Sequence, residues 1–230
     1  MPVRALSTSL PVVGTLAAMI GGAAFVSFAE LASNNQLQGK HAKPLAVGLL
    51  SAPGIAGVAI AAIVFAKLFR TKFLPLLVLC GMGSLLGGGL VSAFSSSDAG
   101  ALVSSLLLGV GAGATVSPGL FLAAFGVSSR QVGRAFALVE LLRSEAAYLV
   151  GPLLLYIATI HPPLYKGTQF ATWITIGLTA TGTAVLIVLF IASGARLHEP
   201  DLEAWLDEGE QAMHSPPTAE RIQNAIRTTP

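Results

Sequence analysis

The stretch 45–68, LAVGLLSAPGIAGVAIAAIVFAKL, runs for 24 residues with Lys67 as its only charged residue. A helix that crosses the apolar core of a bilayer needs about 20 mostly apolar residues. A helix that is apolar on every side is typical of a membrane span or of the interior of a large protein. This stretch therefore predicts a membrane-spanning helix.

The composition of the whole chain extends this interpretation to a polytopic membrane protein. Charged residues make up 10% of the 230 residues, whereas a typical globular protein has about 25%. The first 195 residues contain only four acids, which are Glu30, Asp98, Glu140 and Glu145. That is too few for a water-soluble surface. The high apolar content excludes a disordered chain, the lone Cys80 excludes a disulfide scaffold, and a net charge of +2 gives no indication of nucleic acid as a partner.

Five further stretches share this length and apolar character, so the sequence predicts six transmembrane helices. Their approximate bounds are 10–32, 45–68, 73–94, 100–127, 135–160 and 170–195. The connections are short, so neighbouring helices are expected to run antiparallel and to pack together. We expect an all-α transmembrane domain over residues 1–195, embedded in the lipid bilayer.

Residues 196–230 form a tail of different character, rich in acids and interrupted by prolines. Leu202, Trp205 and Leu206 have the spacing of a short amphipathic helix. We expect this helix to pack on the protein's own cytoplasmic face; a regulatory or partner-binding role is the alternative.

Lysine and arginine in the short loops indicate the orientation. With the N-terminus inside, the cytoplasmic side carries Arg4, Lys67, Arg70, Lys72, Arg130, Arg134 and Arg196, and the opposite side carries Lys40, Lys43 and Lys166. The excess predicts a multi-pass protein of the inner (plasma) membrane with both termini in the cytoplasm. Lys67, Arg70 and Lys72 form a cytoplasmic basic loop between the second and third spans.

The fifth span is the one with charges in its interior. Glu140 and Arg143 are three residues apart on one face and can form a charge pair; a structural pair is favoured over one that contacts substrate. Glu145 lies about 140° around the helix from Glu140 and approaches mid-depth, where a charge is costly unless it faces a cavity or a partner. It is the candidate for carrying a proton or attracting a cation, and the alternative is a structural carboxylate. Glu30, near the end of the first span, is expected to reach interfacial water.

Three proline–glycine pairs interrupt the second, fourth and fifth spans. They are Pro53 with Gly54, Pro118 with Gly119, and Gly151 with Pro152. Proline in a span frees a carbonyl and bends the helix, which is tolerated where protein or a water-filled cavity satisfies it again. Such helices bend during a transport cycle or belong to a static bundle, and both interpretations remain open. The other glycines in the spans indicate close helix packing.

No sequence motif indicates an enzyme. The spans contain no nucleophile–base arrangement, no set of metal ligands and no phosphate-binding loop. We therefore expect neither catalysis nor a resident metal or cofactor.

Several of these features resemble one half of a major facilitator superfamily transporter. Loop residues 65–72, FAKLFRTK, are similar to the basic motif between the second and third helices of each half, but they lack its glycine and aspartate. The run 109–125 followed by 131–135 resembles the fourth span and following loop of the C-terminal half. Its continuation through Glu140, Arg143 and the Gly151–Pro152 pair to 200–206 resembles the drug:proton antiporter branch. The resemblance covers essentially the whole chain.

The resemblance implies two inverted three-helix repeats. It also implies half of a proton-coupled secondary transporter that exports small amphipathic molecules, with protons as the coupling ion. A complete member of that family has two such halves, so we expect the chain to be a fragment or to need a second six-helix half or a homodimer. The alternative is a non-transporting scaffold that packs against partner membrane proteins through its glycine-rich faces.

Overall fold

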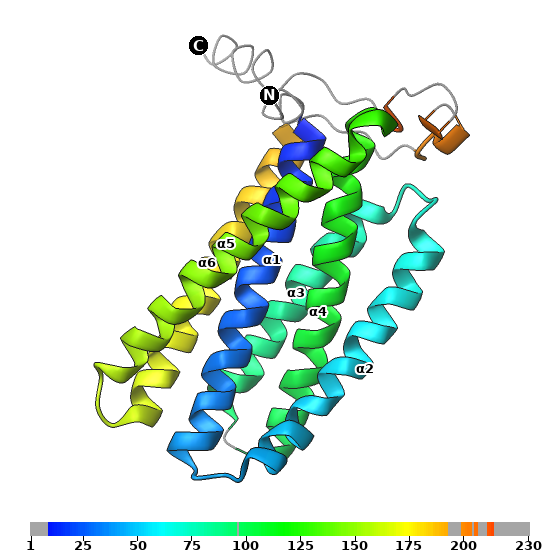
Figure 1. The fold of residues 1–230 in the computed structure, drawn as a ribbon. Helices are drawn as coiled ribbons and strands as arrows, with labels where there is room; N and C mark the ends of the chain where they lie inside the picture. Colours follow the sequence, from blue (N-terminus) through cyan, green and yellow to red (C-terminus); the bar gives the residue numbers. More distant parts are fainter. Residues whose placement is uncertain (1–8, 96, 193–198, 204, 207–210, 214–230) are drawn as a thin grey trace.

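The computed structural model describes residues 9–95, 97–192, 199–203, 205–206 and 211–213. Its described residues form an all-α bundle (Figure 1). The long helices are α1 (Ser9–Asn34), α2 (Pro44–Leu68), α3 (Leu74–Phe94), α4 (Asp98–Phe125), α5 (Val132–Thr159) and α6 (Leu164–Ala192). A π-helical turn, η2 (Asn35–Gly39), continues α1, and a 3-10 turn, η3 (Ser129–Gln131), precedes α5.

All six helices are long and apolar enough to cross a membrane. This confirms the prediction of a polytopic arrangement of apolar helices. The largest difference from the expected bounds is at α6, which begins at Leu164 rather than near residue 170. Its first turn carries Tyr165 and Lys166, and these polar residues hid the helix start from a reading based on apolar runs.

Two helices form the centre of the bundle. α1 and α4 pack against each other, α4 also packs against α2 and α3, and α1 also packs against α5 and α6. We call the end with the α1–α2, α3–α4 and α5–α6 connections the loop end. The opposite end, where α1 begins and α6 ends, is called the termini end (Figure 1).

Backbones touch where the central helices cross their neighbours. A Cβ added at Gly109 of α4 would lie 2.0 Å from the carbonyl oxygen of Gly54 in α2. A Cβ at Gly14 of α1 would lie 2.5 Å from the carbonyl oxygen of Gly119 in α4. Since no side chain fits at either position, glycine is required for these crossings, as expected where helices associate by close packing.

The described part of the tail is seated on the termini end of α4. The indole Nε1 of Trp205 donates a hydrogen bond to the Val127 carbonyl at 3.0 Å, and its ring lies 5.5 Å from that of Phe125. Trp205 is buried, whereas Leu206, which the sequence placed on the same apolar face, is 67% exposed. The described tail thus contacts the bundle through Trp205 and through Met213, whose amide donates to the Phe125 carbonyl at 3.0 Å, while Leu206 stays exposed.

Candidate functional site

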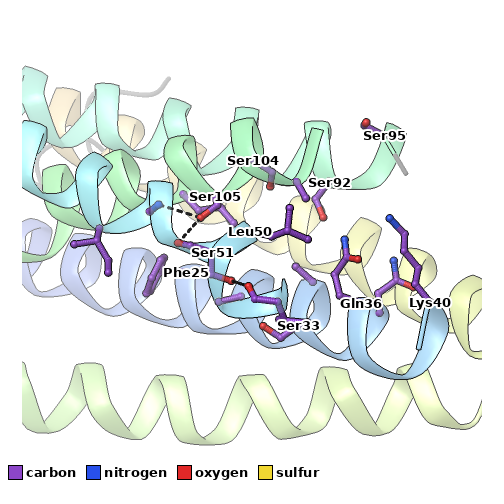
Figure 2. Close-up of a pocket in the computed structure, with 18 of the residues that line it drawn as sticks. Phe25, Ser33, Gln36, Lys40, Leu50, Ser51, Ser92, Ser95, Ser104 and Ser105 are labelled. Atoms are coloured by element: carbon purple, nitrogen blue, oxygen red, sulfur yellow. Dashed lines mark hydrogen bonds between the residues drawn. The ribbon is translucent and has the colours of Figure 1, made fainter. Parts of the chain in front are cut away.

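A cavity of about 230 Å³ lies near the loop end, between α1, α2, α3 and α4 (Figure 2). The described residues that line it are apolar or carry hydroxyl, amide or ammonium groups, and no carboxylate is among them. The polar ones are Ser33, Asn35, Gln36, Lys40, Ser51, Ser92, Ser95, Ser104 and Ser105. A second cavity of about 390 Å³ adjoins the first and extends toward α6.

Serine side chains in this cavity satisfy backbone groups of neighbouring helices. The hydroxyl of Ser105 in α4 donates to the Ser51 carbonyl at 2.9 Å and accepts from the Gly54 amide at 3.0 Å. The hydroxyl of Ser104 donates to the Gly88 carbonyl at 2.8 Å. The Ser105 hydroxyl therefore bonds to the backbone of α2 on both sides of Pro53 and joins α2 to α4 there.

One cation lies at the outer edge of the cavity. The Nζ of Lys40 is 3.9 Å from an oxygen of Asp98, which opens α4, and the Asp98 side chain is 80% exposed. Such exposed ion pairs contribute about 0–1 kcal/mol, so the pair orients Lys40 more than it stabilises the fold.

The structure brings the predicted charge pair together on α5. The Arg143 guanidinium donates to both carboxylate oxygens of Glu140, with an Nε–Oε2 distance of 2.9 Å. The two residues lie about 12 and 17 Å along α5 from its start. The Glu140 side chain is 49% exposed and that of Arg143 25% exposed. A charge pair at that depth therefore lies on the surface of the six-helix unit.

The charge pair and the cavity lie on the same side of α1. A Cβ at Gly22 would be 2.8 Å from the Arg143 side chain, so this side chain crosses α1 at Gly22. Ala29 and Ser33, which line the cavity, follow Gly22 by 7 and 11 residues and share its helix face. One continuous surface therefore joins the charge pair to the cavity.

Glu145 points in a different direction. The buried side of α5 is formed by Ala135, Val139, Ala147, Gly151, Leu154 and Ala158. Glu145 is about 160° around the helix from Ala147 and is exposed. It is flanked by Leu141 and Leu149, which are 57% and 69% exposed. The carboxylate thus faces away from the bundle, near the middle of the 28-residue helix.

The three proline–glycine pairs each meet a different partner. Pro53 and Gly54 meet Ser105, as described above. Pro118 and Gly119 are buried near the termini end of α4, where Gly119 faces Gly14 of α1. The third pair, Gly151 with Pro152, meets an acid.

That acid is Glu30 of α1, whose side chain is partly exposed; the expectation that it reaches interfacial water stays a prediction. Its Oε2 atom is buried and has no hydrogen-bond partner among the described residues. A Cβ at Gly151 would lie 2.6 Å from this oxygen. The sequence did contain a signal, because Ser27, Glu30 and Asn34 recur on one face of α1.

The basic loop is distant from these features. Lys67, Arg70 and Lys72 are exposed at the termini end, and the Lys72 ammonium lies 5.6 Å from the ring centroid of Phe73. In the part of the chain that the structure describes, no group of three His, Cys, Asp or Glu residues could hold a metal ion. No protein-family model matches the chain, and no curated protein matches its sequence.

Proposed function

We propose that the protein is a six-helix half of a proton-coupled secondary transporter that exports small amphipathic molecules, with both termini in the cytoplasm. In this proposal a second six-helix unit, either another chain or a second copy, completes the transport path between the two units. The resemblance to the major facilitator superfamily suggested this function, and three features of the bundle support it.

The observation that carries the proposal is the position of Glu145. A carboxylate near the middle of a spanning helix that points away from its own bundle would face lipid in a lone six-helix unit. Such a placement costs several kcal/mol, and charged groups in spans almost always face a bundle interior or a water-filled cavity. A second unit that covers this side of α5 removes the cost.

The continuous surface between the charge pair and the cavity is the second support. It runs from α5 and α1 at the charge pair to the cavity between α1, α2, α3 and α4, and in this proposal α1, α2, α4 and α5 line the transport path. Hydroxyl and amide groups beside apolar walls suit a small amphipathic molecule. The apolar walls bury its apolar part, and the polar groups fix its orientation. In this proposal Glu145 attracts a cationic substrate when it is deprotonated and releases it when it is protonated.

The contacts between helices are the third support. α2 packs on α4, and α5 packs on α1; α3 packs on α4, and α6 packs on α1. If α1, α2 and α3 are exchanged with α4, α5 and α6 in that order, the α2–α4 contact becomes the α5–α1 contact. The α3–α4 contact likewise becomes the α6–α1 contact. That pattern is expected for two inverted three-helix repeats.

A cysteine accessibility experiment tests whether water reaches the surface that joins the charge pair to the cavity. In a Cys80→Ser background, Ser144→Cys places a thiol one turn after Glu140, on the same face of α5. We expect a membrane-impermeant maleimide to label it in native membranes. The matched control is Val185→Cys on α6, which is 46% exposed but faces lipid in this proposal and should not react. Equal, low labelling at both positions would favour the membrane scaffold instead.

Transport itself is tested with two copies joined in tandem, because α1 begins and α6 ends at the same end of the bundle (Figure 1). Vesicles containing the tandem protein and a fluorescent lipophilic cation should move the dye when a pH gradient is imposed. Glu145→Gln, which mimics the protonated carboxyl, should abolish this movement, and Glu145→Asp should retain part of it. Unchanged transport by the Gln variant would contradict the role of Glu145.

A further inference from the structure

Three buried polar side-chain atoms have no hydrogen-bond partner in the described part of the chain. They are Ser27 Oγ, Glu30 Oε2 and Asn34 Nδ2. All three belong to α1, and their spacing of three and four residues places them in one row on its surface. Buried polar groups are normally paired, so a row of unpaired ones calls for an explanation.

Neighbouring hydroxyl groups do not fill this need, because they bond within their own helix. On α6, which packs against α1, Thr172, Thr175 and Thr179 each donate to the carbonyl four residues earlier, at 2.7–2.8 Å. The row on α1 is therefore left with unused hydrogen-bonding capacity.

The middle member of the row faces the proline break of α5. Glu30 Oε2 lies beside the backbone of Gly151, next to Pro152. Since Pro152 has no amide hydrogen, the carbonyl of Tyr148, one turn earlier, lacks its usual helical donor. A carboxylate can only accept hydrogen bonds, whereas a protonated carboxyl can also donate one. The backbone at the break thus has a carbonyl acceptor without its helical donor. A protonated Glu30 could donate a hydrogen bond there, whereas a carboxylate could not.

No cation compensates Glu30 in the residues that the structure describes. The ionisable groups on helices packed against α1 are Arg134, Glu140, Arg143, Glu145, Tyr148 and Tyr156 on α5, Tyr165 and Lys166 on α6, Asp98 on α4 and Cys80 on α3. Arg134 lies in the first turn of α5, about 25 Å along that helix from Gly151. Arg143 bonds to Glu140 and meets α1 at Gly22, about 12 Å along the helix from Glu30. Lys40, directly after the turn that continues α1, lies 3.9 Å from Asp98, and His161 contacts the Ile157 carbonyl.

We infer that Glu30 is a proton-binding carboxyl that controls the contact between α1 and the Gly151–Pro152 break of α5. With a proton taken from water at the loop end, Glu30 is neutral and can donate to the backbone of α5, which holds the two helices together. When the proton leaves, an unpaired carboxylate remains against the break and weakens this contact. Ser27 and Asn34 extend the polar row on either side of Glu30. Asn34 lies toward the loop end, on the route from water.

A proton fits this position better than a metal cation does. The row supplies a single carboxyl group, and the unpaired atom of Asn34 is a donor nitrogen, which repels cations. The close approach of Gly151 to Oε2 leaves no room for a coordinated ion on that side. The role in coupling rests on the proposed function, but proton binding by Glu30 does not.

Infrared difference spectroscopy of the full chain in lipid vesicles, between acidic and alkaline buffer, tests proton binding directly. Among the carboxyl bands of the chain, we expect one protonated-carboxyl band, separate from that of Glu145, that shifts in D₂O, is lost in Glu30→Gln and persists in Glu145→Gln. Glu30→Asp should restore a carboxyl band at a changed frequency, which guards against misfolding of the Gln variant. A band unchanged in Glu30→Gln, or one removed by Na⁺ at constant pH, would overturn the inference.

A second measurement separates this inference from the proposed function. In the tandem dye assay, Glu30→Gln should abolish movement driven by the pH gradient while Ser144→Cys in that variant is still labelled by maleimide. If the infrared band behaves as expected but no variant or parent moves dye, the proposed function fails and proton binding by Glu30 stands. If the parent moves dye and Glu30→Gln moves it equally well, the coupling role of Glu30 is wrong.

Discussion

Proline interrupts both α2 and α5 toward the loop end, yet the two breaks are completed in opposite ways. Beside Pro53, a hydroxyl from Ser105 of α4 bonds to both the carbonyl and the amide of the neighbouring backbone. Beside Pro152, α1 supplies Glu30, whose buried oxygen has no partner among the described residues. A proline in a span therefore does not by itself identify a moving part; the helix packed against the break decides.

The α2–α4 contact is closed by neutral hydrogen bonds and by backbone touching backbone. Separating these helices would strand the groups that Ser105 now satisfies, whatever the pH. The α5–α1 contact depends on whether one carboxyl carries a proton. The comparison predicts that α2–α4 acts as a fixed joint and that α5–α1 is the joint that responds to protons.

The largest expected effect is that of Gly109→Ala in the fixed joint. The added methyl would lie 2.0 Å from the Gly54 carbonyl oxygen, and a backbone atom cannot move aside alone. Overpacking of this kind costs about 1–3 kcal/mol, so thermal unfolding in detergent should shift to lower temperature. The control is Gly83→Ala on α3, where no atom lies within 4 Å of the added Cβ. Equal unfolding temperatures for the two variants would show that the joint is not tightly closed.

A smaller loss is expected for Ser105→Ala. Removing the hydroxyl leaves the Gly54 amide and the Ser51 carbonyl without this partner, and polar contacts between spanning helices contribute about 0.6 kcal/mol on average. Hydrogen exchange at the Gly54 amide should accelerate. Ser51→Ala is the matched control, because its hydroxyl bonds only to the Val47 carbonyl within α2. Exchange at Gly54 that is unchanged in Ser105→Ala would remove Ser105 from the joint.

The sequence predicts the parts of this comparison but not their pairing. Apolar runs identify the six helices, and a spacing of three residues identifies the contact between Glu140 and Arg143, because both depend on neighbours along one helix. The meeting of Glu30 with Gly151, and that of Pro53 with Ser105, joins residues far apart in the chain. Helical periodicity fixes the face on which a residue lies, but not which helix covers that face.

This limit is severe in a bundle whose helices are apolar on nearly every side. In a soluble protein, polar residues mark the outer face of each helix and so indicate the inner one. Here lipid replaces water, and exposed positions such as Ile55 and Leu149 resemble buried ones in the sequence. The sequence did not predict the cavity either, because its serines come from several helices and form no motif along the chain.

The smallest expected change in stability is that of Gly151→Ala, in the joint that responds to protons. Its methyl would lie 2.6 Å from Oε2 of Glu30, but a carboxylate at the end of a flexible side chain can rotate away. Alanine also favours the helix by about 1 kcal/mol over glycine, which offsets part of the cost. We therefore expect an unfolding temperature close to that of the parent, together with a displaced infrared band for Glu30. If Gly151→Ala were as destabilising as Gly109→Ala, the α5–α1 contact would be as rigid as the α2–α4 contact. Glu30 would then be held in place by packing, and loss of its proton could not loosen the contact between the two helices.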